Sequence, residues 1–251
     1  MRNRFLVGGL VLLLAVLTGC GQAGNQGRKE LTVLAAASLM ESFREIRDAF
    51  VAEHPDVGID FDFQGSSLLA EQIRQGRPAD VYASADARTM RKVVRSGRAA
   101  GDSKTFATNR LTIVVPPDNP AGVTSFADLA GPGEKVVTCA PQVPCGAATE
   151  RVERVAGVRL SPVSEETDVK DVLNKVVAGE ADAGLVYVTD AHAAGEQVRS
   201  IDFPASHEVL NTYPVVSLED AADPELATEF MAFVRGPKGR EILAEYGFGA
   251  P

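Results

Sequence analysis

The stretch "LTVLAAASLMESFREIRDAFVAEH", residues 31–54, joins an apolar run directly to a helical pattern. Residues 31–37 have the composition of a buried strand, and apolar residues then recur at helical spacing over 39–54. Ser38 stands at the junction, three residues before Glu41, which is the spacing of a capping box and predicts Ser38 as the helix N-cap. The stretch therefore predicts a strand-to-helix elbow with small residues and a hydroxyl at its bend.

Strand-like and helix-like patterns alternate along the rest of the chain. We expect strands at 57–63, 79–85, 110–116, 134–140, 183–188 and 212–218, and helices at 67–75, 87–97, 125–131, 147–157, 168–179, 223–236 and 237–248. This order is typical of parallel sheets with crossover helices.

The alternation predicts an α/β fold with two lobes, each a mainly parallel sheet flanked by helices. The length of 251 residues suits two such lobes of about 100 residues each. We expect lobe 1 to comprise 31–108 and 213–251, and lobe 2 to comprise 109–212. Two hinge strands, near 107–111 and 212–217, would then join the lobes.

Residues 1–19 have the parts of a lipoprotein signal peptide: the basic start "MRNR", an apolar segment, and "LTGC" at 17–20. The apolar segment is shorter than the ~20 residues that span a bilayer. We therefore expect cleavage before Cys20, lipid attachment to Cys20, and a flexible tether at 20–30. This predicts an extracytoplasmic protein that is anchored to the cell membrane.

The remaining cysteines, Cys139 and Cys145, lie six positions apart in "CAPQVPC". In an exported protein this spacing predicts a disulfide, with two unpaired core thiols as the alternative. No histidine stands at ligand spacing beside them, so a metal site is not expected. The net charge is −9 and no basic stripe is interleaved with aromatic residues, which argues against nucleic acid as a partner.

Elbows similar to the first recur in "FQGSSLLAEQI", "QVPCGAATERV" and "EETDVKDVL". Each helix N-terminus carries unpaired N–H donors and roughly +0.5 elementary charge, so three or four would match a small dianion. In open α/β sheets, ligands bind at the carboxyl ends of the strands. We expect Asp168 to cap its helix, Lys170 to point to solvent, and Tyr187 either to cap the core or to donate a hydrogen bond to an oxyanion.

These stretches together resemble the molybdate-binding proteins (the ModA family) of bacterial ABC importers. The matching segments cover 31–248 in family order and are "LTVLAAASL", "FQGSSLLAEQIRQGRPADVYASAD", "RLTIVVPPDNP", "PQVPCGA", "EETDVKDVL", "ADAGLVYVTDA", "YPVV" and "GPKGREILAEYGF". The resemblance implies the type II periplasmic-binding fold and a cleft that closes on molybdate or tungstate. It also implies an ABC permease as partner, no cofactor, and a monomer.

Carried over by motif, the resemblance implies five ligand-binding residues. Hydroxyl groups would come from Ser38, Ser66 and Tyr187, and backbone N–H groups from Ser38, Ser66, Cys145 and Val169. The family commonly has alanine at the position of Cys145, but a backbone contact does not depend on the side chain. The motif "GSS" leaves open whether Ser66 or Ser67 faces the ligand.

Two alternatives remain. One is a binding protein for another tetrahedral oxyanion, such as sulfate or phosphate; the resemblance favours molybdate. The other is a hydrolytic enzyme, but His54, His192 and His207 stand in unrelated contexts and none adjoins a recognisable nucleophile motif. The sequence therefore predicts a binding protein and not an enzyme.

Overall fold

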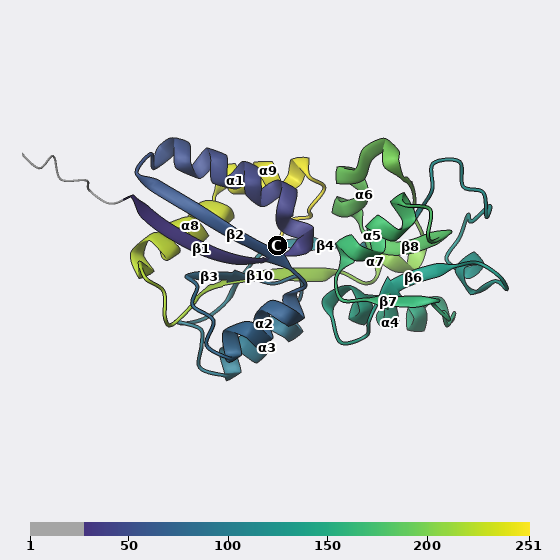
Figure 1. Ribbon diagram of the computed structural model, residues 1–251, viewed down its shortest axis with the longest axis horizontal. Coiled ribbons are helices and arrows are strands. Elements are labelled where there is room, and N and C mark those ends of the chain that lie inside the picture. Colours follow the sequence, from purple (N-terminus) through teal and green to yellow (C-terminus); the bar gives the residue numbers. More distant parts are fainter. Residues whose placement is uncertain (1–27) are drawn as a thin grey trace, which may run out of the picture.

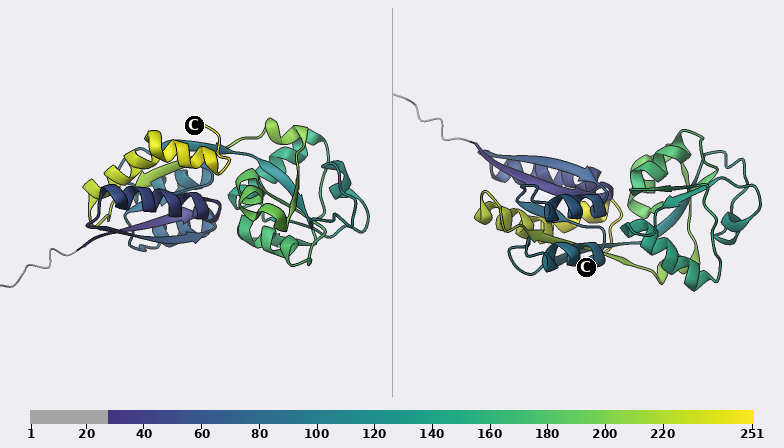
Figure 2. Two further views of the ribbon diagram at one scale, coloured as in Figure 1. Left: turned by 90° about the horizontal axis from the view of Figure 1, so that it is seen from above. Right: turned by 60° about the horizontal axis from the view of Figure 1, so that its bottom comes forward.

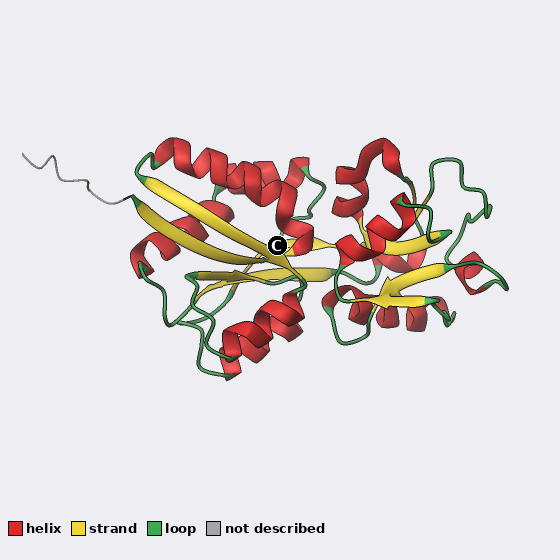
Figure 3. Cartoon of the chain, in the orientation of Figure 1, coloured by secondary structure: helices red, strands yellow, loops and turns green. Residues whose placement is uncertain are grey.

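The computed structural model describes residues 28–251, which form two five-stranded sheets with helices on both faces (Figures 1 and 3). The strand orders are β2-β1-β3-β10-β4 and β7-β6-β8-β5-β9. The first sheet comprises β1 (Lys29–Ala36), β2 (Val57–Gln64), β3 (Val81–Ala83), β4 (Lys104–Asn109) and β10 (Asn211–Ser217). The second comprises β5 (Leu111–Val115), β6 (Val136–Cys139), β7 (Ser164–Glu166), β8 (Ala183–Tyr187) and β9 (Arg199–Ile201). The predicted two-lobed α/β fold is confirmed; below, lobe 1 is the first sheet with its helices and lobe 2 the second.

The two lobes share one local topology. In each, three parallel strands are connected by two helices: α1 (Met40–Glu53) and α2 (Ser66–Arg74) in lobe 1, α4 (Pro144–Ala156) and α5 (Val169–Val177) in lobe 2. In each lobe the second parallel strand lies on one side of the first and the third lies on the other side. The two connecting helices therefore cover opposite faces of the sheet (Figure 1). The N-termini of all four helices therefore follow the carboxyl ends of parallel strands.

The other strand pairs are antiparallel, so both sheets are mixed, and the prediction that they are mainly parallel is wrong: in each sheet two pairs are parallel and two are antiparallel. β4 and β10 pair with Asn211 opposite Asn109, and the chain passes between the sheets directly after Asn109 and directly before Asn211. The first crossing lies where a hinge strand is predicted. The second falls just before the predicted range 212–217, which belongs wholly to β10. Figure 2 shows the two connections next to each other between the lobes, which supports the proposed lobe boundaries.

The remaining helices are α3 (Ala87–Arg95), α6 (Val188–Ala194), α7 (Pro204–His207), α8 (Pro224–Arg235) and α9 (Pro237–Glu245), with single 3-10 turns at Ala37–Leu39, Ala127–Ala130 and Gly195–Gln197. The helix expected at 125–131 is only one of these turns, because the Asp128 carboxylate accepts the N–H groups of Thr124 and Ser125 and holds the segment tight. The strands β7 and β9 were not predicted, and neither were α6 and α7; of β4, only the end that falls in the predicted hinge strand near 107–111 was expected.

The N-terminal predictions fall mostly outside the described residues; this applies to the signal peptide, Cys20 and most of the tether. At its end the predicted tether is two residues too long, because Lys29 and Glu30 already pair with β2. Within residues 28–251, no helix has the length and apolarity required to cross a membrane.

An aromatic cluster holds α1 on the first sheet. Phe43, Ile46 and Phe50 share one face of α1 and are fully or almost fully buried. The Phe43 ring centroid lies 5.7 Å from that of Phe106 on β4, and the Phe50 centroid lies 5.5 Å from that of Phe230 on α8. These contacts join the first and last segments of the chain in one core and fix the direction of the first elbow.

The predicted disulfide between Cys139 and Cys145 is present. It ties the end of β6 to the first turn of α4. Beside it, a Cβ atom on Gly146 would lie 2.0 Å from the Ala140 carbonyl oxygen, so the backbone of this elbow is packed too closely for a side chain there. The third elbow is therefore braced both covalently and sterically.

Replacing both cysteines by serine should lower the free energy of unfolding by about 2 kcal/mol, because the short closed loop no longer restricts the unfolded chain. Denaturant titration of both proteins measures the difference. As a control, reductant should destabilise the parent protein and leave the Cys139→Ser/Cys145→Ser variant unchanged. Equal stability of the two proteins under oxidising conditions would contradict a structural role for the bond.

Candidate functional site

One small cavity lies between the lobes. It is lined by residues at or just after the carboxyl ends of the six parallel strands, three from each lobe. The volume is about 20 Å³, somewhat more than the ~10–15 Å³ that one water requires. Lobe 1 contributes Ala36, Ala37, Ser38, Gly65, Ser66 and Ala85, and lobe 2 contributes Val143, Pro144, Cys145, Thr167, Asp168, Val169 and Tyr187. The structure thus brings all five predicted site residues to one enclosed space, and each of them is buried.

Three helix N-termini point unpaired N–H groups at this cavity. Ser66 and Val169 are the first residues of α2 and α5, and Cys145 is the second residue of α4. Their N–H groups have no acceptor within residues 28–251. Asp168 caps α5 as predicted, but its carboxylate accepts from Lys170 N at 2.8 Å and Asp171 N at 3.2 Å, so the Val169 N–H is left over. The lining therefore carries the positive ends of three helix dipoles.

Ser38 is not the N-cap of α1, so the capping-box prediction is wrong. A 3-10 turn separates β1 from α1, Leu39 takes the N-cap position, and no side chain caps the helix. The inserted turn moves the helix start away from Ser38. Its hydroxyl instead lies 2.9 Å from the Tyr213 hydroxyl.

The hydroxyl of Ser66 is oriented by the protein as a donor to the cavity. Its oxygen accepts the Ala85 N–H at 3.0 Å, and a hydroxyl has only one proton to donate. No protein acceptor takes that proton within the described chain. Ser67, in contrast, donates to the Gln142 carbonyl oxygen at 3.1 Å across the lobe boundary, so it is Ser66 that lines the cavity.

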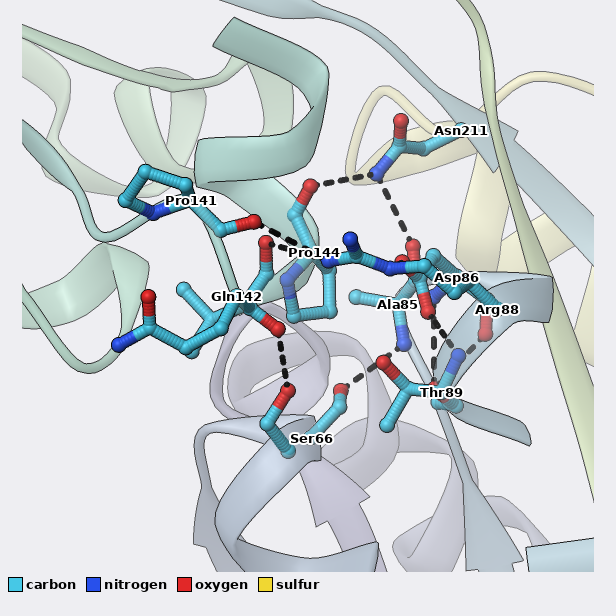
Figure 4. A network of polar contacts seen from close by, with 12 residues as sticks. Ser66, Ala85, Asp86, Arg88, Thr89, Pro141, Gln142, Pro144 and Asn211 are labelled. Carbon is cyan, nitrogen blue, oxygen red and sulfur yellow. Dashed lines mark hydrogen bonds and ion pairs between the residues drawn. The ribbon is translucent and has the colours of Figure 1, made fainter. Parts of the chain in front are cut away.

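Tyr187 is oriented in the same way through Asn211. The Asn211 amide nitrogen donates to the Tyr187 hydroxyl at 2.7 Å and to the Ala85 carbonyl oxygen at 3.1 Å (Figure 4 shows Asn211 beside Ala85 and Pro144). The amide cannot turn over, because the Arg151 guanidinium donates to its oxygen. Since the Tyr187 oxygen already accepts a hydrogen bond from Asn211, its single proton is available to a ligand in the cavity that it lines.

Asn109, opposite Asn211 in the paired strands, fixes Ser38 by a longer path. The Arg110 N–H donates to the Asn109 amide oxygen at 2.9 Å, which leaves the amide nitrogen to donate to the Thr189 hydroxyl at 2.9 Å and, at the longer distance of 3.5 Å, to the Tyr213 hydroxyl. The Tyr213 and Ser38 hydroxyls share one hydrogen bond, in which either oxygen can be the donor. When Tyr213 donates, the proton of Ser38 remains for the cavity. Burial raises the pKa of both the Tyr187 and the Tyr213 phenol, so neither loses its proton near neutral pH.

No lysine or arginine lines the cavity. The place of Lys170 on the first turn of α5 predicts that it points to solvent. That prediction is wrong. The Lys170 ammonium group lies 2.9 Å from a Glu41 carboxylate oxygen in lobe 1 and 3.3 Å from Asp190 in lobe 2. Burial raises the pKa of Asp190 to about 6, and Lys170 opposes that rise. Lys170 thus connects the two lobes beside the cavity without entering it.

The lobes are in direct contact around the cavity. Arg88 in lobe 1 donates to the Pro141 carbonyl oxygen in lobe 2 at 3.2 Å (Figure 4). The backbone of Gly65 lies so near lobe 2 that a Cβ atom there would be 2.5 Å from the Thr167 carbonyl oxygen. The structure is therefore the closed arrangement of the lobes, and Gly65 is a position where their backbones approach closely.

The site has no features of a metal centre or a nucleophilic active site. Within residues 28–251, no group of three His, Cys, Asp or Glu side chains is placed to hold a metal ion. None of the histidines lines the cavity, and His207 instead lies 2.8 Å from Asp202 at the surface of lobe 2. The lining offers hydroxyl and amide donors, which suit a small anion.

This fold and this donor-lined interlobe cavity define an extracytoplasmic solute-binding protein. The family model described as bacterial extracellular solute-binding protein matches residues 31–249, and the chain belongs to that family. It is 47% identical over 248 residues to the molybdate-binding protein ModA of Mycobacterium tuberculosis, covering 96% of this chain and 95% of the relative. It is also 30% identical over 256 residues to the putative ABC transporter substrate-binding lipoprotein YvgL of Bacillus subtilis, covering 96% of each chain.

Among solved structures, the fold matches the periplasmic molybdate-binding protein of Azotobacter vinelandii. The TM-score is 0.77 at 23% identity, covering 88% of this chain and 99% of that one. The relatives are transport proteins that bind solutes.

Replacing Gly65 by alanine should weaken anion binding at least tenfold, because the new methyl group meets the Thr167 carbonyl only when the lobes are closed. Equilibrium titration measures the affinity, and small-angle scattering measures whether ligand still compacts the protein. Gly58→Ala is the matched control, since its methyl group meets only the movable end of the Glu30 side chain. Normal affinity in Gly65→Ala would show that ligand binding does not require this closed arrangement.

Asn211→Ala should weaken anion binding only through Tyr187. In a double-mutant cycle, Asn211→Ala and Tyr187→Phe should each cost affinity, while the double variant should bind within about twofold of Tyr187→Phe. Asn174→Ala, an exposed amide on α5, serves as the control. Additive effects in the cycle would mean that Asn211 does not act by orienting the Tyr187 hydroxyl.

Proposed function

We propose that this protein captures molybdate, and also tungstate, in the interlobe cavity and delivers it to an ABC importer. The observation that carries the proposal is the direction of the donors. The hydroxyls of Ser66 and Tyr187 accept from protein groups and so have their protons left for a ligand, and the Ser38 hydroxyl has its proton left when Tyr213 donates to it. The backbone N–H groups of Ser66, Cys145 and Val169, at three helix N-termini, add three more hydrogen-bond donors for an anion.

A cavity lined in this way suits an anion that carries no proton. Phosphate retains a proton near neutral pH and gains from an acceptor carboxylate in its site. Asp168 is the one carboxylate in the lining, and it is engaged in capping α5. Molybdate, tungstate and sulfate need only donors. Between them, the 47% identity to a molybdate-binding relative supports molybdate.

Neutral donors also suit a protein that must release its ligand. No buried ion pair has to be broken when the anion leaves, because the lining contains no cationic side chain. Closure removes the anion from water, and opening restores its hydration. The site has no need of a cofactor and is arranged for binding, not for catalysis.

The surroundings of the protein form part of the same proposal. The N-terminal pattern ending in "LTGC" supports lipid attachment at Cys20, and the likeness to a relative named as a substrate-binding lipoprotein agrees with it. We infer a monomer tethered to the outer face of the cell membrane, where the closed form docks on a membrane permease. Residues 20–28 would supply the length of chain between lipid and lobe 1.

Thermal unfolding with molybdate, tungstate, sulfate and phosphate tests the proposal. A ligand that binds only the folded state at a thousandfold excess over its Kd adds about 4 kcal/mol of stability. Molybdate and tungstate should raise the melting temperature at micromolar concentration, and phosphate should not. A response to sulfate alone, or to none of the four anions, would overturn the assignment.

Two variants test whether the cavity is the site. Ser38→Ala and Tyr187→Phe should each weaken molybdate binding by about 1–3 kcal/mol, because each removes a donor to a buried oxyanion. Ser103→Ala and Tyr246→Phe make the same chemical changes outside the cavity and should bind normally. Unchanged affinity in both cavity variants would place the site elsewhere.

A further inference from the structure

A second hollow, here called the arginine groove, lies between α3 of lobe 1 and α4 of lobe 2. Its volume is about 320 Å³. Its walls carry Arg88 and Arg91 from α3, and Arg151 and Arg154 from α4. The carboxylates in the lining are Asp86 and Glu150. The groove thus has a positive balance in a protein whose net charge is −9.

The charges of the four arginines are largely uncompensated. Arg151 donates to the Leu210 carbonyl oxygen at 3.3 Å and to the Asn211 amide oxygen, and both acceptors are neutral. Arg88 likewise bonds to carbonyl oxygens across the lobe boundary. These bonds hold the guanidinium groups in place without cancelling their charge.

The other charged groups of the groove change this balance little. Arg91 and Arg154 are exposed and form no ion pair within residues 28–251. Asp86 uses one carboxylate oxygen to cap α3 through the Thr89 N–H at 2.6 Å, and the other lies 3.6 Å from Arg88. Two carboxylates, those of Asp86 and Glu150, therefore stand against four guanidinium groups.

We propose that the arginine groove is a second anion-binding site, for a multiply charged oxoanion, and that filling it favours the closed arrangement. Closure brings two arginines of lobe 1 opposite two of lobe 2 in one groove, and their like charges repel each other. An anion between them turns that repulsion into attraction. Guanidinium groups are also well matched to the oxygens of tetrahedral oxoanions.

The groove and the cavity share a wall. Asn211 lines the groove, is held there by Arg151, and donates to Tyr187, which lines the cavity. An anion that draws Arg151 and Arg88 into the closed position thereby helps to fix the Tyr187 donor. This coupling rests on the proposed function, whereas anion binding in the groove does not. By linkage, each anion should tighten the binding of the other.

Nuclear magnetic resonance of the arginine side chains tests the groove directly. The 15N-labelled protein is titrated with sodium phosphate in the millimolar range, above the micromolar range of the thermal test, at constant ionic strength and with and without saturating molybdate, and the Nε–H signals are followed. Phosphate should shift the signals of the groove arginines in both states. No shift at these arginines would overturn the proposal.

Paired variants separate a site from general charge. Arg91→Ala/Arg154→Ala should weaken phosphate binding at least tenfold. Arg95→Ala/Arg159→Ala removes the same charge from exposed positions on α3 and just beyond α4, outside the groove, and should change it less than twofold. An equal loss in the two double variants would show diffuse attraction only and contradict a site.

The coupling has a separate readout. Phosphate should tighten molybdate binding at least twofold in the parent protein and leave it unchanged in Arg91→Ala/Arg154→Ala. Unchanged or weaker molybdate binding in the parent protein would refute the link to closure. If molybdate failed to shift the amide signals of Ser66, Cys145 and Val169, the proposed function would fail, while the arginine signals would still report on the groove.

Discussion

The paired asparagines at the two connections between the lobes determine what the cavity can bind. Asn109 ends β4, Asn211 begins β10, and the two stand opposite each other in the sheet. Each amide is held in one orientation by a donor to its oxygen, and each then passes a hydrogen bond toward a cavity hydroxyl. With the Asn211 amide turned over, the Tyr187 hydroxyl would donate to the amide oxygen instead of to a ligand, and the site would lose part of its preference for an anion without a proton.

This arrangement explains how an acidic protein can hold an anion in a dry site. Net charge governs the long-range field, whereas helix N-termini and oriented hydroxyls act within a few ångströms. The closed lobes leave a cavity of only about 20 Å³ between buried residues, where each hydrogen bond is stronger than in bulk water. The ion pair of Lys170 with Glu41 joins the lobes beside the cavity, and the lining itself contains no cationic side chain.

Much of the fold and the location of the site could be predicted from local sequence, because strand-to-helix elbows are local features. Ser66, Cys145 and Val169 each directly follow a strand or a short turn, and the spacing of Cys139 and Cys145 predicts their bond. Ser38 lines the cavity, but its predicted capping role is wrong, since a 3-10 turn that the pattern does not reveal separates it from α1.

The orienting contacts could not be predicted, because they join residues distant in sequence. Ser38 and Tyr213 are 175 positions apart, and Asn211 meets Tyr187 from a different lobe. Lys170 was misjudged for the same reason: Glu41 lies 129 positions away and only the closed lobes bring it near. Nothing in the local pattern of these residues marks them, and only the pairing of β4 with β10 brings the two asparagines together.

The central claim is that the cavity consists of fixed donors around an unprotonated anion, with no group that changes its protonation. Calorimetric titration with molybdate at pH 7.5, repeated in buffers of different ionisation enthalpy, measures the protons exchanged on binding. The account predicts the same binding enthalpy in every buffer, which corresponds to no proton exchanged. An enthalpy that changes linearly with buffer ionisation, with a slope near one proton per anion, would contradict it.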